Sequence, residues 1–140
     1  MRRISTRVHH QPGELVWGRI FNSLEDRNST GKWRPVVILA PGHCQHHVVG
    51  LTGQPCYKTT GQARVAIPNP AACGLSGGGF IWSSRPYRCS RIDLGDHIGW
   101  ADGELAAVIA NMVDADWNII DRMLDAVARR SRGGDHGLAL

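Results

Sequence analysis

The chain has 140 residues, a hydrophobic content of 42% and a net charge of +4, values that fit one globular domain with a modest core. No apolar run approaches membrane-spanning length, and the polar start lacks the apolar core of a secretion signal. We therefore expect a cytoplasmic protein with no membrane partner. The widely spaced cysteines are expected to be free thiols: Cys44, Cys56, Cys73 and Cys89.

Charge is divided unevenly along the chain. Residues 17–92 hold nine Lys or Arg against two acids, a net +7, whereas residues 93–128 hold eight acids against one Arg, a net −7. A basic body predicts a polyanion or an acidic peptide as partner, and nucleic acid is the commonest polyanion. The alternative is that the two halves neutralise each other by packing together.

Short strands dominate the first hundred residues. Residues 1–11 are polar and aperiodic, which predicts a disordered basic arm, and residues 22–32 form a long polar loop. Between turn signals, runs of alternating or continuous apolar residues predict strands. The predicted strands cover residues 14–21, 34–40, 48–52, 59–68, 80–84, 87–92 and 95–100.

The second of these strands has the clearest signal. Residues 36–39 are four consecutive aliphatic side chains, a pattern typical of a strand covered on both faces. Proline belongs at the first position of a strand, so Pro35 places Arg34 just outside the sheet, at the rim of the core. An arginine held there by its neighbours is suited to binding an anion or a phosphate.

From Asp102 the apolar period changes to that of a helix. Asp102 is a candidate N-cap, and the pair Asp114 and Asp116 can divide the helix near Trp117. Arginines followed by glycines end it, so residues 129–140 are expected to form a flexible basic tail. Residues 12–128 are then one mostly-β domain, a small barrel capped by a C-terminal helix.

Three short motifs follow one another along the chain: PGELVW at 12–17, GKWRPVVIL at 31–39 and VGLT at 49–52. In these three motifs the chain resembles the PemK/MazF family of toxin endoribonucleases from toxin–antitoxin systems. The resemblance implies an SH3-like β-barrel that forms a homodimer. It also implies metal-independent, sequence-specific cleavage of single-stranded RNA by attack of the 2′-hydroxyl, no cofactor, and inhibition by a cognate antitoxin protein.

The resemblance assigns roles to two residues, and residue chemistry indicates further candidates. The resemblance places Arg34 and Thr52 at the scissile phosphate, where a fixed guanidinium stabilises developing charge. Three residues are candidates for acid or base catalysis: Glu25, His43 and His47. The expected RNA contacts are Lys32, Trp33, Ser84, Arg85 and Arg88. For Trp33 the alternative is that its ring covers the open end of the barrel.

Two other functions are compatible with the sequence. A non-catalytic SH3-like module could use the same groove to hold a nucleic acid or an acidic peptide. A zinc site is the second alternative, with ligands drawn from His43, Cys44, His46, His47 and Cys56. Neighbouring residues point to opposite faces of a strand, so only a subset of these could converge on one ion.

Overall fold

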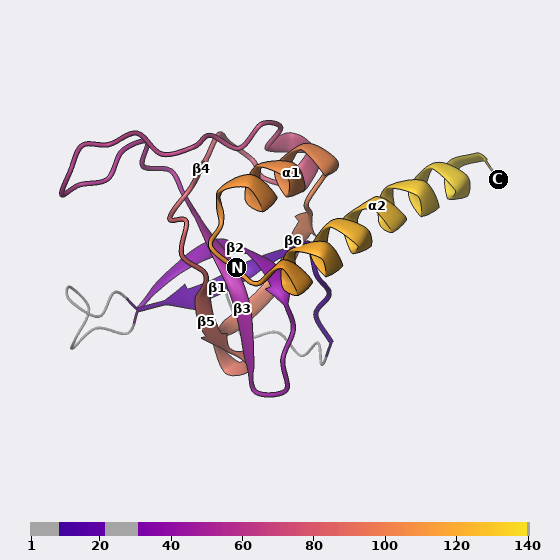
Figure 1. Cartoon of the computed structure of the whole chain (residues 1–140), viewed down its shortest axis with the longest axis horizontal. Helices are drawn as coiled ribbons and strands as arrows, with labels where there is room; N and C mark the ends of the chain where they lie inside the picture. The colour runs from indigo at the N-terminus through magenta and orange to yellow at the C-terminus, as the bar shows by residue number, and fades with distance from the viewer. Residues whose placement is uncertain (1–8, 22–30, 140) are drawn as a thin grey trace.

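The computed structural model describes residues 9–21 and 31–139, with side chains as far as Arg132. Six strands are followed by two helices, α1 (Gly103–Met112) and α2 (Trp117–Ala139). The strands are β1 (Glu14–Ile20), β2 (Lys32–Ala40), β3 (Gln45–Thr52), β4 (Phe80–Ile81), β5 (Tyr87–Ser90) and β6 (Leu94–Trp100). Two short 3-10 turns are η1 (Ala71–Cys73) and η2 (Arg91–Asp93). Figure 1 shows α2 extending away from the sheet beyond α1.

The strands form one antiparallel sheet in the order β4-β3-β2-β1-β6, and β5 also pairs with β3. Turn η2 connects β5 to β6, but among the described residues no ladder joins these two strands. The mostly-β character and the C-terminal helical region are therefore confirmed. The prediction of a closed barrel is wrong, because the sheet stays open between β5 and β6.

The strand predicted over residues 59–68 is absent. The segment makes only two isolated bridges, Cys56 to Ala63 and Ala66 to Phe80. Gly61 adopts a left-handed backbone with φ +70°, and its N–H donates to the carbonyl of Tyr57, so the chain turns back here instead of extending. Alternating polarity favoured a strand, but the turn at Gly61 divides the segment.

Strand β2 is covered on both faces, as its sequence predicts. Side chains 36–39 are all fully buried and alternate between two clusters. One cluster lies under the helices and includes Leu15, Val37, Leu39, Val49, Leu105, Ile109 and Met123. The other lies on the opposite face and includes Val16, Ile20, Val36, Ile38, Val48, Cys89 and Leu94. These two clusters hold β2 rigidly in the centre of the sheet.

Pro35 lies inside β2 rather than at its start. The strand begins at Lys32, and Pro35 is opposite Trp17 in the ladder with β1. The ladder with β3 begins only at Val36, so proline interrupts no pairing on that edge. The prediction that Arg34 stands outside the sheet is therefore corrected: it pairs with β1, at Gly18, and extends beyond the β3 ladder.

The helical region divides near Trp117, as the aspartates suggested. Asp102 caps α1 by accepting the Leu105 N–H at 2.9 Å, and Asp116 accepts the Asn118 N–H at 2.8 Å, beside the first turn of α2. Helix α2 continues to Ala139, over residues for which the sequence predicts a flexible tail. Arg129 pairs with Asp125 one turn earlier, and this contact supports the helix past the predicted end. No helix of the described ranges combines the length and apolar character needed to cross a bilayer.

A cluster of polar side chains around the buried Glu14 joins the N-terminal segment to β1 and β6, and Arg130 of α2 lies beside it. The Glu14 side chain is fully buried, with its carboxylate 2.8 Å from Nδ1 of His97 and 3.7 Å from Nδ1 of His10. Arg130 stacks on Trp100 at 4.0 Å from the ring centre and donates to the Pro12 carbonyl. His10, within the segment predicted to be a disordered arm, is 5% exposed; residues 1–8 lie outside the described ranges.

His46 is expected to make folding stability depend on pH. Its pKa is lowered from 6.5, first by burial and then by neighbouring His10 and Arg91. Below pH 6.5 the unfolded chain therefore binds a proton that the folded chain does not, and the free energy of unfolding falls as pH drops until the folded pKa is reached. Urea unfolding at pH 7.5 and 5.5 should show a smaller pH-dependent loss in His46→Leu than in the wild type. An equal loss in both proteins would contradict this assignment.

Candidate active site

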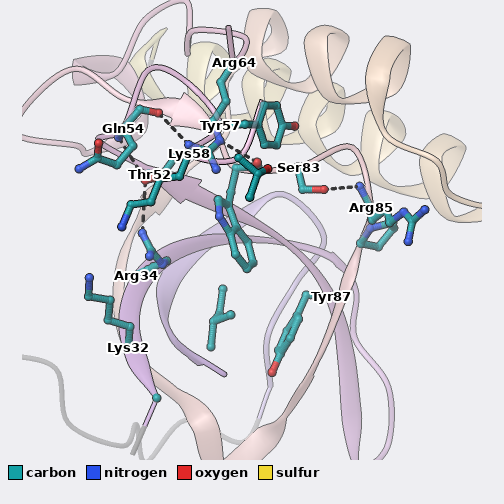
Figure 2. A pocket seen from close by; sticks show the side chains of 15 residues that line it. Lys32, Arg34, Thr52, Gln54, Tyr57, Lys58, Arg64, Ser83, Arg85 and Tyr87 are labelled. Carbon is teal, nitrogen blue, oxygen red and sulfur yellow. Dashed lines mark hydrogen bonds between the residues drawn. The ribbon is translucent and has the colours of Figure 1, made fainter. Parts of the chain in front are cut away.

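A basic cavity of about 650 Å³ opens where the ladder between β2 and β3 ends (Figure 2). Five of its lining residues are cationic: Lys32, Arg34, Lys58, Arg64 and Arg85. Three are aromatic: Tyr57, Trp82 and Tyr87. None of the described lining residues is Asp, Glu or His. The described lining therefore combines several cations with flat apolar surfaces, which suits a polyanion that also carries rings.

Arg34 and Thr52 meet at this cavity because of the sheet register. Val36 is opposite Gly50 at the end of the ladder, so Arg34, two residues before Val36, and Thr52, two residues after Gly50, emerge from the same end of the two strands. Nη1 of Arg34 donates to Oγ1 of Thr52 at 3.3 Å (Figure 2). The guanidinium carbon is 5.5 Å from the centre of the Trp82 ring. The pair predicted from the motifs is thus brought together, with the fork of Arg34 at the cavity wall.

Trp82 is seated against a glycine of β3. Its backbone N–H donates to the Gly50 carbonyl at 2.9 Å, and a Cβ at Gly50 would lie 3.0 Å from the indole ring. The absence of a side chain at Gly50 therefore lets the ring lie flat beside Arg34. Trp82 packs on the second core cluster and also lines the cavity.

The Thr52 hydroxyl has a defined hydrogen-bonding role. The Thr52 residue is 6% exposed, and its Oγ1 accepts two hydrogen bonds, from Arg34 at 3.3 Å and from the Gln54 N–H at 3.2 Å. A hydroxyl has two acceptor lone pairs and one hydrogen, so the remaining capacity of Thr52 is that of a donor. Thr52 is therefore suited to donating to an anionic oxygen and unsuited to accepting a proton.

Of the residues predicted to contact RNA, some line the cavity and others do not. Lys32 and Arg85 line the cavity, where they could contact the phosphates of an RNA strand. Trp33 and Ser84 do not line it: Arg19 lies over the Trp33 ring at 5.6 Å, and the Ser84 carbonyl accepts the Asp114 N–H. Their predicted RNA contacts therefore have no support in the geometry.

The candidate proton-transfer residues are not brought to Arg34. His47 is opposite Ala40 and Arg88, five residues before Thr52 in β3, which corresponds to about 17 Å along an extended strand. His43 is farther away, in the turn between β2 and β3. Arg88 lies at the same distant end, so none of these three predicted site residues is brought to the pair of Arg34 and Thr52. Glu25 lies outside the described residues.

The described residues offer neither a reactive thiol nor a metal site at the cavity. All four cysteines are free, and burial raises the pKa of the Cys89 thiol to about 12, so it is an inert core group. Within residues 9–21 and 31–139 no group of three His, Cys, Asp or Glu side chains lies close enough to hold a metal ion. The zinc alternative thus has no ligand set in the described chain.

Sequence reasoning missed one complete wall of the cavity. Gln54, Tyr57, Lys58 and Arg64 all belong to residues 53–66, part of which was predicted as a strand. The available signal was the pair of cations, Lys58 and Arg64, in a segment bounded by Gly and Pro turn residues. Their convergence with Arg34 depends on the fold of this segment, which no short-range pattern specifies.

No protein-family model matches the chain, and no curated protein shows significant sequence similarity to it. Function is therefore inferred from the geometry and charge of the cavity.

Proposed function

We propose that the chain is an endoribonuclease of the PemK/MazF kind, a toxin that cuts single-stranded RNA by attack of the 2′-hydroxyl on the adjacent phosphate. The observation that carries this proposal is the hydrogen-bonded pair of Arg34 and Thr52 in a cavity whose described lining is cationic and free of acids. These are the two residues to which the resemblance gives the scissile phosphate.

The chemistry follows from the donors that the pair presents. As O2′ bonds to phosphorus and the P–O5′ bond breaks, a proton leaves O2′ and one is added to O5′, giving a 2′,3′-cyclic phosphate and a 5′-hydroxyl. Negative charge grows on the non-bridging oxygens during this step. The Arg34 fork and the Thr52 hydroxyl are donors that can hydrogen-bond to those oxygens more strongly as the charge develops.

Single-stranded RNA is the preferred substrate because the cavity also carries aromatic rings. Trp82, Tyr57 and Tyr87 line it among the cations, and unstacked bases pack on such rings while the phosphates contact Lys and Arg. A base inside a duplex is already stacked and cannot use these surfaces. Duplex RNA is thus expected to be a poor substrate.

The wider family properties also form part of the proposal. The order β5-β3-β2-β1-β6, with a 3-10 turn before β6, supports an SH3-like fold whose barrel remains open. A homodimer would extend the basic surface along the RNA. An antitoxin with an acidic segment would fill the same cavity and block it, because its carboxylates would pair with the cations that bind phosphate.

A second candidate function is a binding module without catalysis. It is favoured by the absence of any His, Asp or Glu from the described lining, since those are the usual proton-transfer groups. Incubating the purified protein with mixed RNA in EDTA and mapping the new 5′ ends separates the two. Recurrent cut positions are expected; RNA that is bound but remains intact would reject the nuclease and leave the binding module.

RNA binding is expected to weaken steeply with salt. If about three of the five lining cations neutralise phosphates, the slope of log K against log salt for a single strand is about −2. Affinity should then fall about 20-fold between 50 and 200 mM salt. Fluorescence anisotropy with a labelled oligoribonucleotide measures this slope. A salt-independent affinity would contradict phosphate recognition by the cavity.

A further inference from the structure

The wall of the cavity opposite Lys32 is a folded loop, residues 53–66, which we call the 53–66 loop. Three backbone hydrogen bonds close it on itself: Tyr57 N–H to Gln62 O at 2.9 Å, Gly61 N–H to Tyr57 O at 2.8 Å, and Arg64 N–H to Pro55 O at 2.8 Å. The loop therefore has a defined shape without belonging to the sheet, and its backbone holds the side chains at fixed positions beside the cavity.

Arg64 ties this loop to the sheet. Its Nε donates to the Trp82 carbonyl at 2.9 Å, and its Nη1 donates to the carbonyls of Cys56 at 2.8 Å and Gln54 at 3.2 Å. Its guanidinium carbon also lies 4.4 Å from the centre of the Tyr57 ring. Arg64 thus differs from the other lining cations: its fork is directed at backbone oxygens, which makes it a positioning residue rather than a phosphate ligand.

Gln54 is held next to the catalytic pair from both sides of its backbone. Its N–H donates to Oγ1 of Thr52, and its carbonyl accepts from Arg64 (Figure 2). The Gln54 side chain is exposed and lines the cavity, where its amide offers both donors and an acceptor. Tyr57, backed by the Arg64 guanidinium, adds an aromatic ring to the same wall.

The two walls therefore offer different chemistry. Lys32 and Arg34 on one side carry charge, which attracts phosphates without regard to sequence. An amide and an aromatic ring on the other side are groups that hydrogen-bond to base edges and stack on bases. A sequence-selective nuclease needs both kinds of contact: one wall can bind the phosphates of the RNA while the other binds the base.

We propose that the 53–66 loop selects the base beside the cleaved phosphate: Gln54 hydrogen-bonds to the edge of that base, Tyr57 stacks on it, and Arg64 positions both. This inference rests on the proposed function and extends it, because it restricts the substrate to single-stranded RNA with a preferred base at one position. Lys58, on the same loop, adds only charge and serves as the matched control.

Selection from uncleavable RNA tests the loop directly. Random-sequence 2′-O-methyl RNA, which lacks the attacking hydroxyl, is captured by the immobilised protein and sequenced. The wild type should enrich one base at one position, and Gln54→Ala should lower that enrichment about tenfold, the discrimination of one good base contact. Tyr57→Ala should lower it as well, whereas Lys58→Ala should reduce the RNA captured and leave the base preference unchanged.

Arg64→Ala checks the positioning role. It should remove the base preference although Gln54 and Tyr57 are intact, at a melting temperature close to that of the wild type. Unchanged enrichment in the Gln54 and Tyr57 variants, or no enrichment by the wild type, would overturn the inference. Cleavage of ordinary RNA is measured separately, so a protein that cuts without base preference keeps the proposed function, and one that enriches without cutting keeps only base recognition.

Discussion

Arg34→Ala is expected to reduce RNA cleavage by about 100- to 1,000-fold, the usual cost of removing one donor that stabilises a developing oxyanion. Arg34 lies at the cavity wall, where its guanidinium reaches Thr52 at 3.3 Å. The side chain is part-buried but outside both core clusters, so the fold should survive its removal. Single-turnover cleavage of a defined oligoribonucleotide, with thermal unfolding in parallel, measures both effects.

Two further variants sharpen this result. Arg34→Lys keeps the charge but loses the fork, so cleavage should fall to an intermediate rate while the salt dependence of binding stays close to that of the wild type. Arg88→Ala is the matched control: it removes an exposed arginine of β5 at the distant end of β3 and should leave cleavage unchanged. Equal losses in Arg34→Ala and Arg88→Ala would show that general charge, not the site, is responsible.

Glu14→Ala is expected to lower the free energy of unfolding by about 3 kcal/mol, because it removes a buried acceptor from buried His10 and from the more exposed His97. The carboxylate is fully buried beside His10 and His97, and its charge favours the cationic form of Arg130, whose pKa burial lowers. A loss of this size should lower the melting temperature by about 10 °C. Chemical denaturation and thermal unfolding measure the two quantities.

Glu14→Gln separates charge from hydrogen bonding at this position. The amide keeps an oxygen for the Gln11 N–H, which donates to the carboxylate at 3.1 Å in the wild type, but it removes the negative charge. An intermediate loss of stability is expected, smaller than that of Glu14→Ala, because the amide still accepts a hydrogen bond. If Glu14→Ala unfolds at the same denaturant concentration as the wild type, the cluster contributes nothing to folding.

The parts of the site that could be predicted are those fixed by local pattern and strand register. Residues 36–39 specify a strand buried on both faces, and two adjacent antiparallel strands place the first residues of one beside the last residues of the other. Arg34 and Thr52 therefore meet for reasons visible in the sequence. Asp102 as a helix cap and the division near Trp117 are also short-range features.

The parts that could not be predicted depend on contacts between distant segments. The 53–66 loop is shaped by Arg64 bonding to carbonyls of its own loop and of Trp82, and no periodicity reports such bonds. The helix continues past residue 129 with support from tertiary contacts, since Arg130 packs on Trp100. His43 and His47 have suitable chemistry but lie near the wrong end of β3, a difference that composition does not reveal.

The most direct measurement of the proposed activity is the chemical nature of the cut ends. A defined oligoribonucleotide is cleaved in EDTA beside an identical strand with a single 2′-deoxy nucleotide on the 5′ side of the cut. Attack by the 2′-hydroxyl at Arg34 and Thr52 predicts a 2′,3′-cyclic phosphate and a 5′-hydroxyl from the first strand and no cut at that site in the second. Cleavage of the 2′-deoxy site, or products ending in a 3′-hydroxyl, would contradict it.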